Sequence, residues 1–198
     1  MPTTPPNPIL TSTPRLHISL FNPKDPQHST FLHKLATTTP GFEDYVGHSP
    51  RIRTPTDATT YLTTQLQPRY AASGHRYGDF LVSRRPHPTA TLAESVPIGA
   101  VYLDDEVKGH AVASIGYCVL PGEAGRGYAS EVGRALVRYA RAEMGLRGVC
   151  GICAVGDARS RRVLVKIGFV ERGVWDFSTL GGGGKRFFLD GWARSRMA

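Results

Sequence analysis

The sequence predicts a mixed α/β fold in a single domain, and three observations support this. The chain has 198 residues, a length that suits one domain and buries roughly 70% of the unfolded surface. Three consecutive segments in its middle alternate apolar and polar residues, as antiparallel strands do. The second half then changes to a helix, a strand, a helix and two more strands. This order indicates one mixed sheet covered by helices, which we place in residues 15–198.

The first third of the chain predicts one strand and two helices behind a polar tail. Residues 1–14 are rich in Pro and Thr, bury little apolar surface and are expected to be disordered. Residues 16–21 alternate as a strand does, and residues 26–38 carry Phe and Leu at helical spacing. Thr54, followed by Pro and an acidic residue, is a typical helix start, and Pro68 is expected to end or kink that helix.

The remaining elements follow in an order that defines the sheet. Polar turns separate three predicted strands, at 79–84, 96–103 and 110–120. The pattern then predicts a helix, a strand and a second helix, at 128–144, 149–155 and 157–167. Gly168 ends the second helix. Two closing strands are predicted on either side of four consecutive glycines, at 169–177 and 185–190.

Composition indicates a soluble globular protein and leaves several partners open. Hydrophobic residues make up 40% of the chain and charged residues 20%. No apolar run approaches the roughly 20 residues that span a bilayer, and the chain start lacks a secretory signal pattern. We therefore expect a cytoplasmic protein with no membrane partner, and the nucleus remains open as a location. The formal charge of +8 fits nucleic acid, an acidic surface or a phosphate-bearing cofactor. No known nucleic-acid module is present, so that partner is disfavoured.

Two of the three cysteines form a C-x-x-C pair, Cys150 and Cys153. They lie in GVCGICAV, which predicts a strand, and residues three apart on a strand point to opposite faces. No second cysteine pair completes a zinc site. We expect both thiols to be structural, and we expect no metal site.

The most informative segment is the glycine-rich stretch LPGEAGRGYASE at residues 120–131, between a strand and a helix. Glycines let backbone N–H groups approach a ligand, and the helix start adds about half a positive charge. Together they favour binding of a pyrophosphate. Gly122 and Gly127 have the spacing of a P-loop but lack the Lys and Ser/Thr that follow in one. A dinucleotide fingerprint would need Gly or Ala in place of Ser130, and an acidic residue about twenty positions further on.

The same stretch resembles the acetyl-CoA motif R/Q-x-x-G-x-G/A of the GNAT superfamily. Ala124, Gly127 and Ala129 take its first, fourth and sixth positions, and GRGYASE is similar to the form in the RimJ/RimL-like branch. Further similar segments are IRTPTDATTYL, IGYCVLP and DARSRRVLVKIGFVERG, at 52–62, 115–121 and 157–173. Because these motifs occur in order and at the right spacing, the resemblance covers roughly residues 15–190.

This resemblance implies the GNAT fold, a mixed twisted sheet of about seven strands flanked by helices and splayed between its fourth and fifth strands. It implies acetyl-CoA as cosubstrate, bound in the splay. The pantetheine arm would pair like an added strand with the backbone of Cys118, Val119 and Leu120. The remaining implied cofactor contacts are Gly125, Arg126, Gly127, Tyr128, Ala129, Ser130, Asp157 and Ser160. Of these, Arg126 would add charge at the phosphates, and Tyr128 has helix packing as an equal alternative.

The implied activity is that of an acyltransferase, which moves acetyl directly to a primary amine of a small molecule or a protein N-terminus, as a monomer or homodimer. The oxyanion would be held by backbone N–H groups near Val119. Three positions depart from the pattern of many relatives, where glutamate, asparagine and tyrosine are replaced by Ser114, Asp157 and Leu164. The candidate catalytic residues that remain are Ser160 and Tyr117.

Several alternatives stay open at this point. A water relay could move the proton, or Asp105 or His110 could act as acid or base. The protein could also be a non-catalytic acyl-CoA-binding or sensor protein of the same fold. A basic cluster at the start of the last helix either contacts the CoA 3′-phosphate or forms a solvated face, and it comprises Arg159, Arg161 and Arg162.

Overall fold

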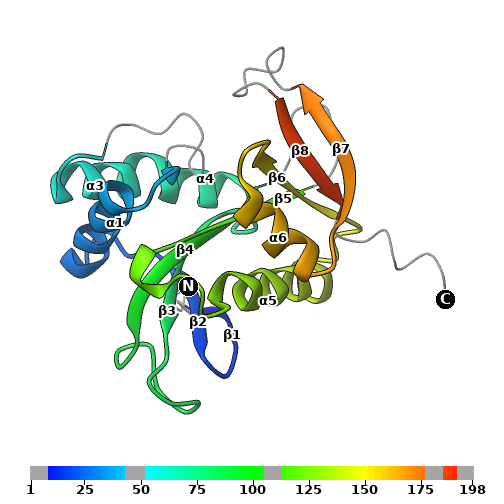
Figure 1. Cartoon of the computed structure of the whole chain (residues 1–198). Coiled ribbons are helices and arrows are strands. Elements are labelled where there is room, and N and C mark those ends of the chain that lie inside the picture. Colours follow the sequence, from blue (N-terminus) through cyan, green and yellow to red (C-terminus); the bar gives the residue numbers. More distant parts are fainter. Residues whose placement is uncertain (1–8, 43–51, 105–112, 177–184, 191–198) are drawn as a thin grey trace.

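The computed structural model describes residues 9–42, 52–104, 113–176 and 185–190, which form one mixed sheet with helices on both faces (Figure 1). In the described residues the sheet has eight strands, in the order β1-β2-β3-β4-β5-β6-β8-β7. Their bounds are Ile9–Ser12, Leu16–Leu20, Gly78–Arg84, Val96–Asp104, Ala113–Val119, Val149–Ala154, Val170–Asp176 (β7) and Lys185–Asp190 (β8). The predicted α/β class is confirmed, with one strand more than expected.

The additional strand is β1, which corrects the prediction of a disordered tail over residues 1–14. Ile9–Ser12 pairs antiparallel with β2, with Ser12 opposite His17. The turn between them is closed by Thr13, whose hydroxyl accepts a hydrogen bond from the Leu16 N–H at 2.9 Å. The high Pro and Thr content predicted disorder, but a short apolar segment within it is stabilised by pairing with the edge of β2. Residues 1–8 lie outside the described residues.

Strands β1 to β5 form an antiparallel half, and β5 pairs in parallel with β6. This parallel pairing joins only Ala113–Ile115 with Val149–Gly151, whereas β5 continues to Val119. The sheet therefore opens between β5 and β6 beyond Ile115. These are the fourth and fifth strands of the prediction, which did not include β1, so the predicted splay is confirmed. The part of the fourth predicted strand at 110–112 lies outside the described residues.

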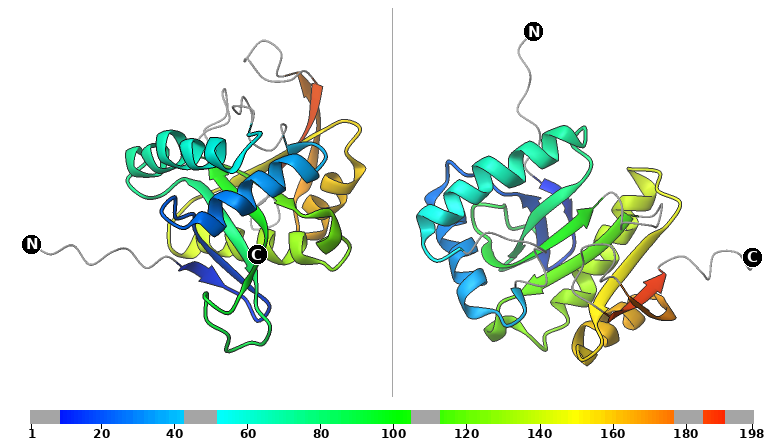
Figure 2. Two further views of the ribbon diagram at one scale, coloured as in Figure 1. Left: turned by 90° about the vertical axis from the view of Figure 1, so that its left-hand side faces the viewer. Right: turned by 90° about the horizontal axis from the view of Figure 1, so that it is seen from above.

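Helices cover the two faces of the sheet unequally (Figure 2). One face carries a core cluster from the first helices, with Phe31, Leu62 and Cys118 among its members. These helices are α1 (Pro26–Thr38), α3 (Pro55–Tyr61), the π-helical turn η1 (Leu62–Leu66) and α4 (Gln67–Ala72). The other face carries the larger core cluster, to which α5 (Tyr128–Ala142) and α6 (Ala158–Lys166) contribute. No helix in the described ranges is long and apolar enough to cross a bilayer.

Two features of the α3–α4 segment test the predicted helix signals. Thr54 and Asp57 form a reciprocal capping box, so the predicted start is confirmed. Pro68 does not end the helix, because the chain stays helical to Ala72. The turn before it is π-helical, and the Gln67 N–H donates to the carbonyl of Leu62. A proline in the first turn of α4 loses no required hydrogen bond there, which explains the continuation.

The last two strands form a hairpin beyond the splay, seen in orange and red in Figure 1. Strand β8 lies between β6 and β7 and is antiparallel to both. Trp175 stacks on Phe188 with ring centroids 4.9 Å apart, a contact that links β7 to β8. The glycine run at 181–184 lies outside the described residues.

Candidate functional site

The glycine-rich turn joins the open edge of β5 to the start of α5. A short 3-10 turn, η2 (Pro121–Glu123), leaves β5, and Gly127 is the N-cap of α5. Gly125 and Gly127 have φ of 79° and 82°, the left-handed region that only glycine enters without strain. No side chain caps the helix, so its first N–H groups point toward the space before it.

The space above this turn is open. A Cβ built on Gly125 would meet no heavy atom within 4 Å, and one on Gly127 would meet only Arg15, at 3.7 Å. An open backbone cradle at a helix N-terminus fits a pyrophosphate group, because the N–H groups can donate to its oxygens. The structure thus brings together the turn residues predicted from the sequence, Gly125 to Ser130.

Arg15, between β1 and β2, braces this turn from a segment distant in sequence. Its guanidinium lies 4.8 Å from the ring centroid of Tyr128. Its Nε donates to the carboxylate of Glu131 at 2.7 Å, and an Nη donates to the carbonyl of Arg126 at 3.2 Å. Thr13 donates to the same carboxylate. Sequence reasoning missed Arg15. This residue follows residues 9–12, which were predicted to be part of a disordered tail and instead form β1.

The charge of Arg126 is shared with a neighbouring carboxylate. Its guanidinium lies 3.3 Å from Glu123, which also lies 3.6 Å from Arg84. The side chain of Arg126 is 56% exposed, so it can turn toward a phosphate without leaving a buried charge. Tyr128 belongs to the core cluster under α5, in agreement with its packing alternative.

The open edge of β5 provides backbone for a ligand to pair with. Beyond Ile115 the described part of β6 no longer pairs with β5, while β4 holds its other edge through the pair Gly99–Val119. The Leu120 N–H is used on the β4 side, where it donates to the carbonyl of Ile98 at 2.9 Å. The Cys118 side chain packs under the first helices, and burial raises the pKa of its thiol to about 12. Cys118 therefore carries no thiolate at neutral pH.

Tyr117 and Ser160, both predicted as catalytic, meet across the splay. The Tyr117 hydroxyl donates to the carbonyl of Ser160 at 2.8 Å and interacts with its side chain. Burial raises the pKa of Tyr117, so its hydroxyl keeps its proton. The Ser160 N–H donates to Asp157 at 2.9 Å, which makes Asp157 the N-cap of α6. A protonated hydroxyl thus links β5 to α6 beside the open edge.

The two other departures from the family pattern have structural explanations. Leu164 is a buried core residue, and a Cβ on Gly151 would lie 2.5 Å from its side chain. Leu164 therefore packs on β6 and fills this position with an apolar contact. Ser114 is buried on β5, where it is hydrogen-bonded to the side chain of Tyr102 on β4. Tyr102 was missed from sequence, since only the β4–β5 register brings it to this site.

Other predicted groups take no part in this arrangement or cannot be placed. Arg161 forms a two-point ion pair with Glu171, at 2.7 and 2.6 Å, and so points toward β7. Asp105 and His110 lie outside the described residues. Cys150 and Cys153 are buried thiols that form no disulfide within the described part of the chain, and they belong to different core clusters, as expected for opposite faces of a strand.

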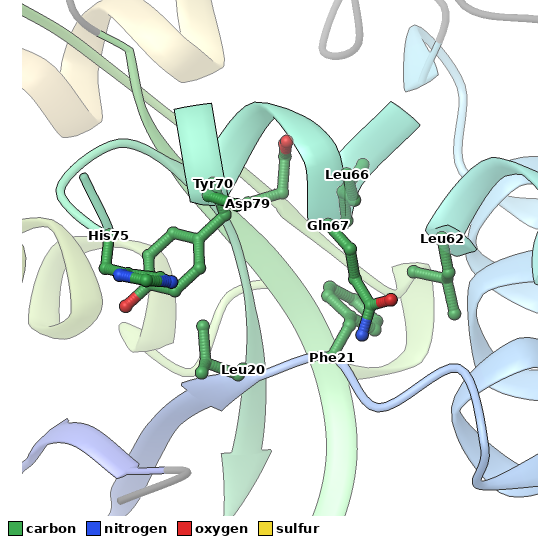
Figure 3. A pocket seen from close by; sticks show the side chains of 9 residues that line it. Leu20, Phe21, Leu62, Leu66, Gln67, Tyr70, His75 and Asp79 are labelled. Atoms are coloured by element: carbon green, nitrogen blue, oxygen red, sulfur yellow. The ribbon is translucent and has the colours of Figure 1, made fainter. Parts of the chain in front are cut away.

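A separate pocket of about 280 Å³ lies under α4, on the β2–β3 side of the sheet (Figure 3). Aliphatic and aromatic side chains line it, among them Phe21, Leu66 and Tyr70. Its carboxylate, Asp79, is ion-paired with Arg69. This lining offers no helix N-terminus or glycine turn for phosphates, so the pocket is not where the predicted cofactor contacts gather.

Comparisons with known proteins agree with this geometry. The family described as acetyltransferase (GNAT) domain matches residues 15–170. A search of curated proteins found no match.

Solved structures of similar fold include three acetyltransferases. A GNAT-family acetyltransferase from Bacillus anthracis is 20% identical, with a TM-score of 0.66 over 90% of this chain and 95% of that one. The ribosomal-protein-S5-alanine acetyltransferase from Vibrio fischeri is 14% identical, with a TM-score of 0.64 over 91% and 94%. The microcin C7 self-immunity acetyltransferase MccE, solved with acetyl-CoA and AMP, is 13% identical, with a TM-score of 0.65 over 91% and 92%. At these identities the likeness establishes a shared fold.

Proposed function

Since this chain belongs to the GNAT acetyltransferase family, we propose that it is an N-acetyltransferase that moves acetyl from acetyl-CoA directly to a primary amine. The observation that carries the proposal is the uncapped turn with left-handed glycines at 125 and 127, placed at the mouth of the open β5 edge. The CoA pyrophosphate would bind the N–H groups of the uncapped turn, and the extended pantetheine arm would pair with the open β5 edge. The two features therefore have to lie side by side. The ribosomal-protein acetyltransferase among its structural neighbours agrees with the RimJ/RimL-like branch and makes a protein N-terminus one candidate acceptor.

The cofactor contacts divide between backbone and side chains. The N–H groups from Gly125 to Ser130 would hold the pyrophosphate, with Arg126 adding charge. Cys118, Val119 and Leu120 are the predicted backbone partners of the pantetheine arm, and Val119 is the one that would pair with it, because Leu120 donates to Ile98 on β4 and alternate residues of an antiparallel strand face the same neighbour. Acetyl-CoA would supply the activated acetyl thioester.

Direct transfer requires little covalent chemistry from the protein. A bond forms between the amine nitrogen and the acetyl carbon, the carbon–sulfur bond breaks, and the electron pair leaves with sulfur. The nitrogen loses one proton and the sulfur gains one. The Tyr117 hydroxyl keeps its proton and lies beside the open edge, so we assign it to protonation of the leaving sulfur. The hydroxyl would turn for this from the Ser160 carbonyl, to which it donates, toward the sulfur, and the proton released by the nitrogen would then return to the phenolate through water.

Calorimetry and a turnover assay test the proposal together. Acetyl-CoA should bind the wild type, and an amine panel of peptides with free N-termini, N-acetylated peptides and small diamines should release thiol with at least one free amine. The Tyr117→Phe variant should bind acetyl-CoA normally and lose about 10- to 100-fold in kcat, because it cannot donate the proton. Failure of the wild type to bind acetyl-CoA would refute the proposal.

The altered positions favour one second candidate, a non-catalytic acyl-CoA-binding or sensor protein. Leu164 packs against Gly151 at the position where many relatives carry a tyrosine. Ser114 stands where many relatives carry a glutamate, and it offers no carboxylate. Binding of acetyl-CoA with no thiol release for any amine in the panel would support this candidate over the enzyme.

A further inference from the structure

Helices α5 and α6 gather basic side chains on one surface of the fold. The two helices pack against each other on the same face of the sheet (Figure 1). They meet where the Arg134 guanidinium donates to the carbonyl of Lys166 at 3.2 Å, and where a Cβ on Gly133 would lie 3.0 Å from Ile167. Each helix presents a row of exposed cations, and the two rows, which we call the basic face, comprise Arg134, Arg138, Arg141, Arg159, Arg162 and Lys166.

Helical periodicity places each row on the solvent side of its helix. The cations recur at intervals of three and four residues, so they share one side of α5 and one side of α6. Leu136 and Leu164 lie on the opposite sides and are buried in the core. Each row therefore extends about 10 Å along its helix, at 1.5 Å per residue.

The charge of the basic face is not neutralised by neighbouring carboxylates. Helix α6 contains no acidic residue, and Glu131 of α5 pairs with Arg15. Glu171, beside α6, pairs with Arg161, which is not part of the face. Within the described residues, no carboxylate forms an ion pair with any of the six cations. Like charges three and four residues apart repel each other, and a bound anion would remove this repulsion.

Acetyl-CoA does not account for the whole basic face. On the proposed function, the pyrophosphate lies at the start of α5, where Gly127 is the N-cap. Arg138 and Arg141 lie about 16 Å and 21 Å further along this helix. The CoA 3′-phosphate, an alternative partner for Arg159 and Arg162, would leave the row on α5 without a ligand. The basic face thus fits a longer anion than the cofactor.

The composition of the surface indicates the class of this anion. Five of the six cations are arginines, whose planar guanidinium donates two parallel hydrogen bonds to phosphate oxygens. A protein partner needs an apolar core in the interface, and a bilayer needs an apolar helix face. The exposed apolar residues of α5 and α6 are only Ala142, Ala158 and Val165. A nucleic acid requires neither, because closely spaced phosphates dominate its affinity.

We propose that the basic face binds the phosphate backbone of a nucleic acid. No aromatic side chain is exposed on α5 or α6, so the surface has no platform on which bases could stack. Contacts to phosphates carry no sequence information, so binding is independent of base sequence. The chain lacks a known nucleic-acid module, and this disfavoured such a partner in the sequence. The packing of α5 on α6 is what brings the cations together.

Fluorescence anisotropy with the full chain tests the proposal. The probes are a labelled 20-nucleotide RNA, a DNA of the same sequence and the duplex of each. The wild type should bind with a micromolar Kd at 50 mM salt, with a slope of log affinity against log salt of about −4 on a single strand for six phosphate contacts. A scrambled sequence should bind equally well. The probe that binds most tightly identifies RNA or DNA as the source of the backbone.

A triple variant, Arg138→Gln with Arg141→Gln and Lys166→Gln, removes half of the basic face. Its affinity at 50 mM salt should fall about 10- to 30-fold, and its salt slope should shrink by about 2, because three phosphate contacts are lost. These side chains are exposed and lie away from the glycine-rich turn, so acetyl-CoA binding by calorimetry should be unchanged. Unchanged acetyl-CoA binding also shows that the variant is folded.

The matched control removes the same charge from the other face of the sheet. Lys24→Gln, Lys34→Gln and Arg53→Gln change exposed residues around α1 and α3, and this triple variant should bind the probes as the wild type does. Equal weakening of both triple variants would overturn the proposal, because net charge alone would then explain the binding. The absence of binding by the wild type at 50 mM salt would overturn it as well.

Two further anions distinguish a nucleic acid from other polyanions. Vesicles with one-third phosphatidylglycerol and polyglutamate should bind the wild type at least 10-fold more weakly than the best nucleic-acid probe. Equal or tighter binding to either would overturn the proposal in favour of a membrane or an acidic protein. These outcomes leave the proposed function untouched, since acetyl-CoA binding and amine turnover are measured separately.

Discussion

On the proposed function, the β5–β6 splay has a phosphate end that is built from backbone and a thioester end that is built from side chains reaching across strands. At the phosphate end, Gly125 to Ser130, the donors are N–H groups held by left-handed glycines and braced by Arg15. At the thioester end, around Gly116, the polar groups are hydroxyls of Tyr102 and Tyr117. A backbone site needs only glycines at fixed positions, so its pattern can be recognised in the sequence. A side-chain site can be refilled from a neighbouring strand, so its residues can change while its chemistry remains.

The largest effect should come from breaking the backbone geometry of the phosphate end. In Gly127→Ala, the residue must keep φ near 82° at a cost of about 1–2 kcal/mol or move the helix start. Loss of two charge-assisted hydrogen bonds, at about 1.5 kcal/mol each, should then weaken acetyl-CoA binding about 100-fold by calorimetry. Gly122→Ala is the control, because its added Cβ meets nothing within 4 Å, and it should bind normally. Equal affinities of the two variants would contradict a backbone site.

A methyl group at Gly116 should disrupt the thioester end through Tyr102. The added Cβ would overlap the tyrosine ring, so Gly116→Ala should lose about 2 kcal/mol of unfolding free energy in urea titration. In a Tyr102→Ala background the same change should cost much less, since the overlap is gone. Additive effects in this double-mutant cycle would show that the ring does not rest on Gly116. Gly156→Ala, which meets no neighbour, controls for the loss of a glycine.

Cys118, midway between the two ends, should make stability depend on alkaline pH. Its folded-state pKa is raised to about 12, so the folded thiol holds its proton at pH values where the unfolded chain has lost it. The stabilisation is complete below the ordinary thiol pKa and declines as pH rises toward 12. Between pH 7 and pH 10 the wild type should lose about 1.5–2 kcal/mol more than Cys118→Ala in urea unfolding. Parallel losses in the two proteins would contradict burial of this thiol.

The smallest effect should come from the brace on the phosphate end. Arg15→Ala removes an ion pair and a cation–π contact that are half exposed, so acetyl-CoA affinity should fall by only about threefold to fivefold. The loss should diminish at high salt, because exposed charges are screened. Arg161→Ala, which removes a comparable ion pair with Glu171, should leave affinity unchanged. A 100-fold loss in Arg15→Ala would instead mean that this side chain contacts the phosphates.

Several elements could be predicted because their causes are local. The Thr54 cap, the helix start at Tyr128 and the end of α6 at Gly168 depend on residues within one turn of each other. The predicted disorder of residues 9–12 and the predicted end of the helix at Pro68 were wrong for the same reason, because both used local residues alone. Pairing of Ile9–Ser12 with β2 and continuation of the helix through Pro68 depend on neighbours outside the local pattern.

The sequence by itself determined the α/β class, the splay implied by its family resemblance and the glycine turn at residues 125–127, because each follows from residue order and backbone freedom. Tertiary structure alone decided which side chains meet at the thioester end. In the sequence, Ser114 and Leu164 stand where many relatives carry a glutamate and a tyrosine. In the structure, cross-strand register places Tyr102 beside Ser114, and helix packing fits Leu164 against Gly151. Backbone turns are specified by neighbours in sequence, whereas a set of side chains drawn from β4, β5 and α6 exists only after the sheet has fixed their alignment.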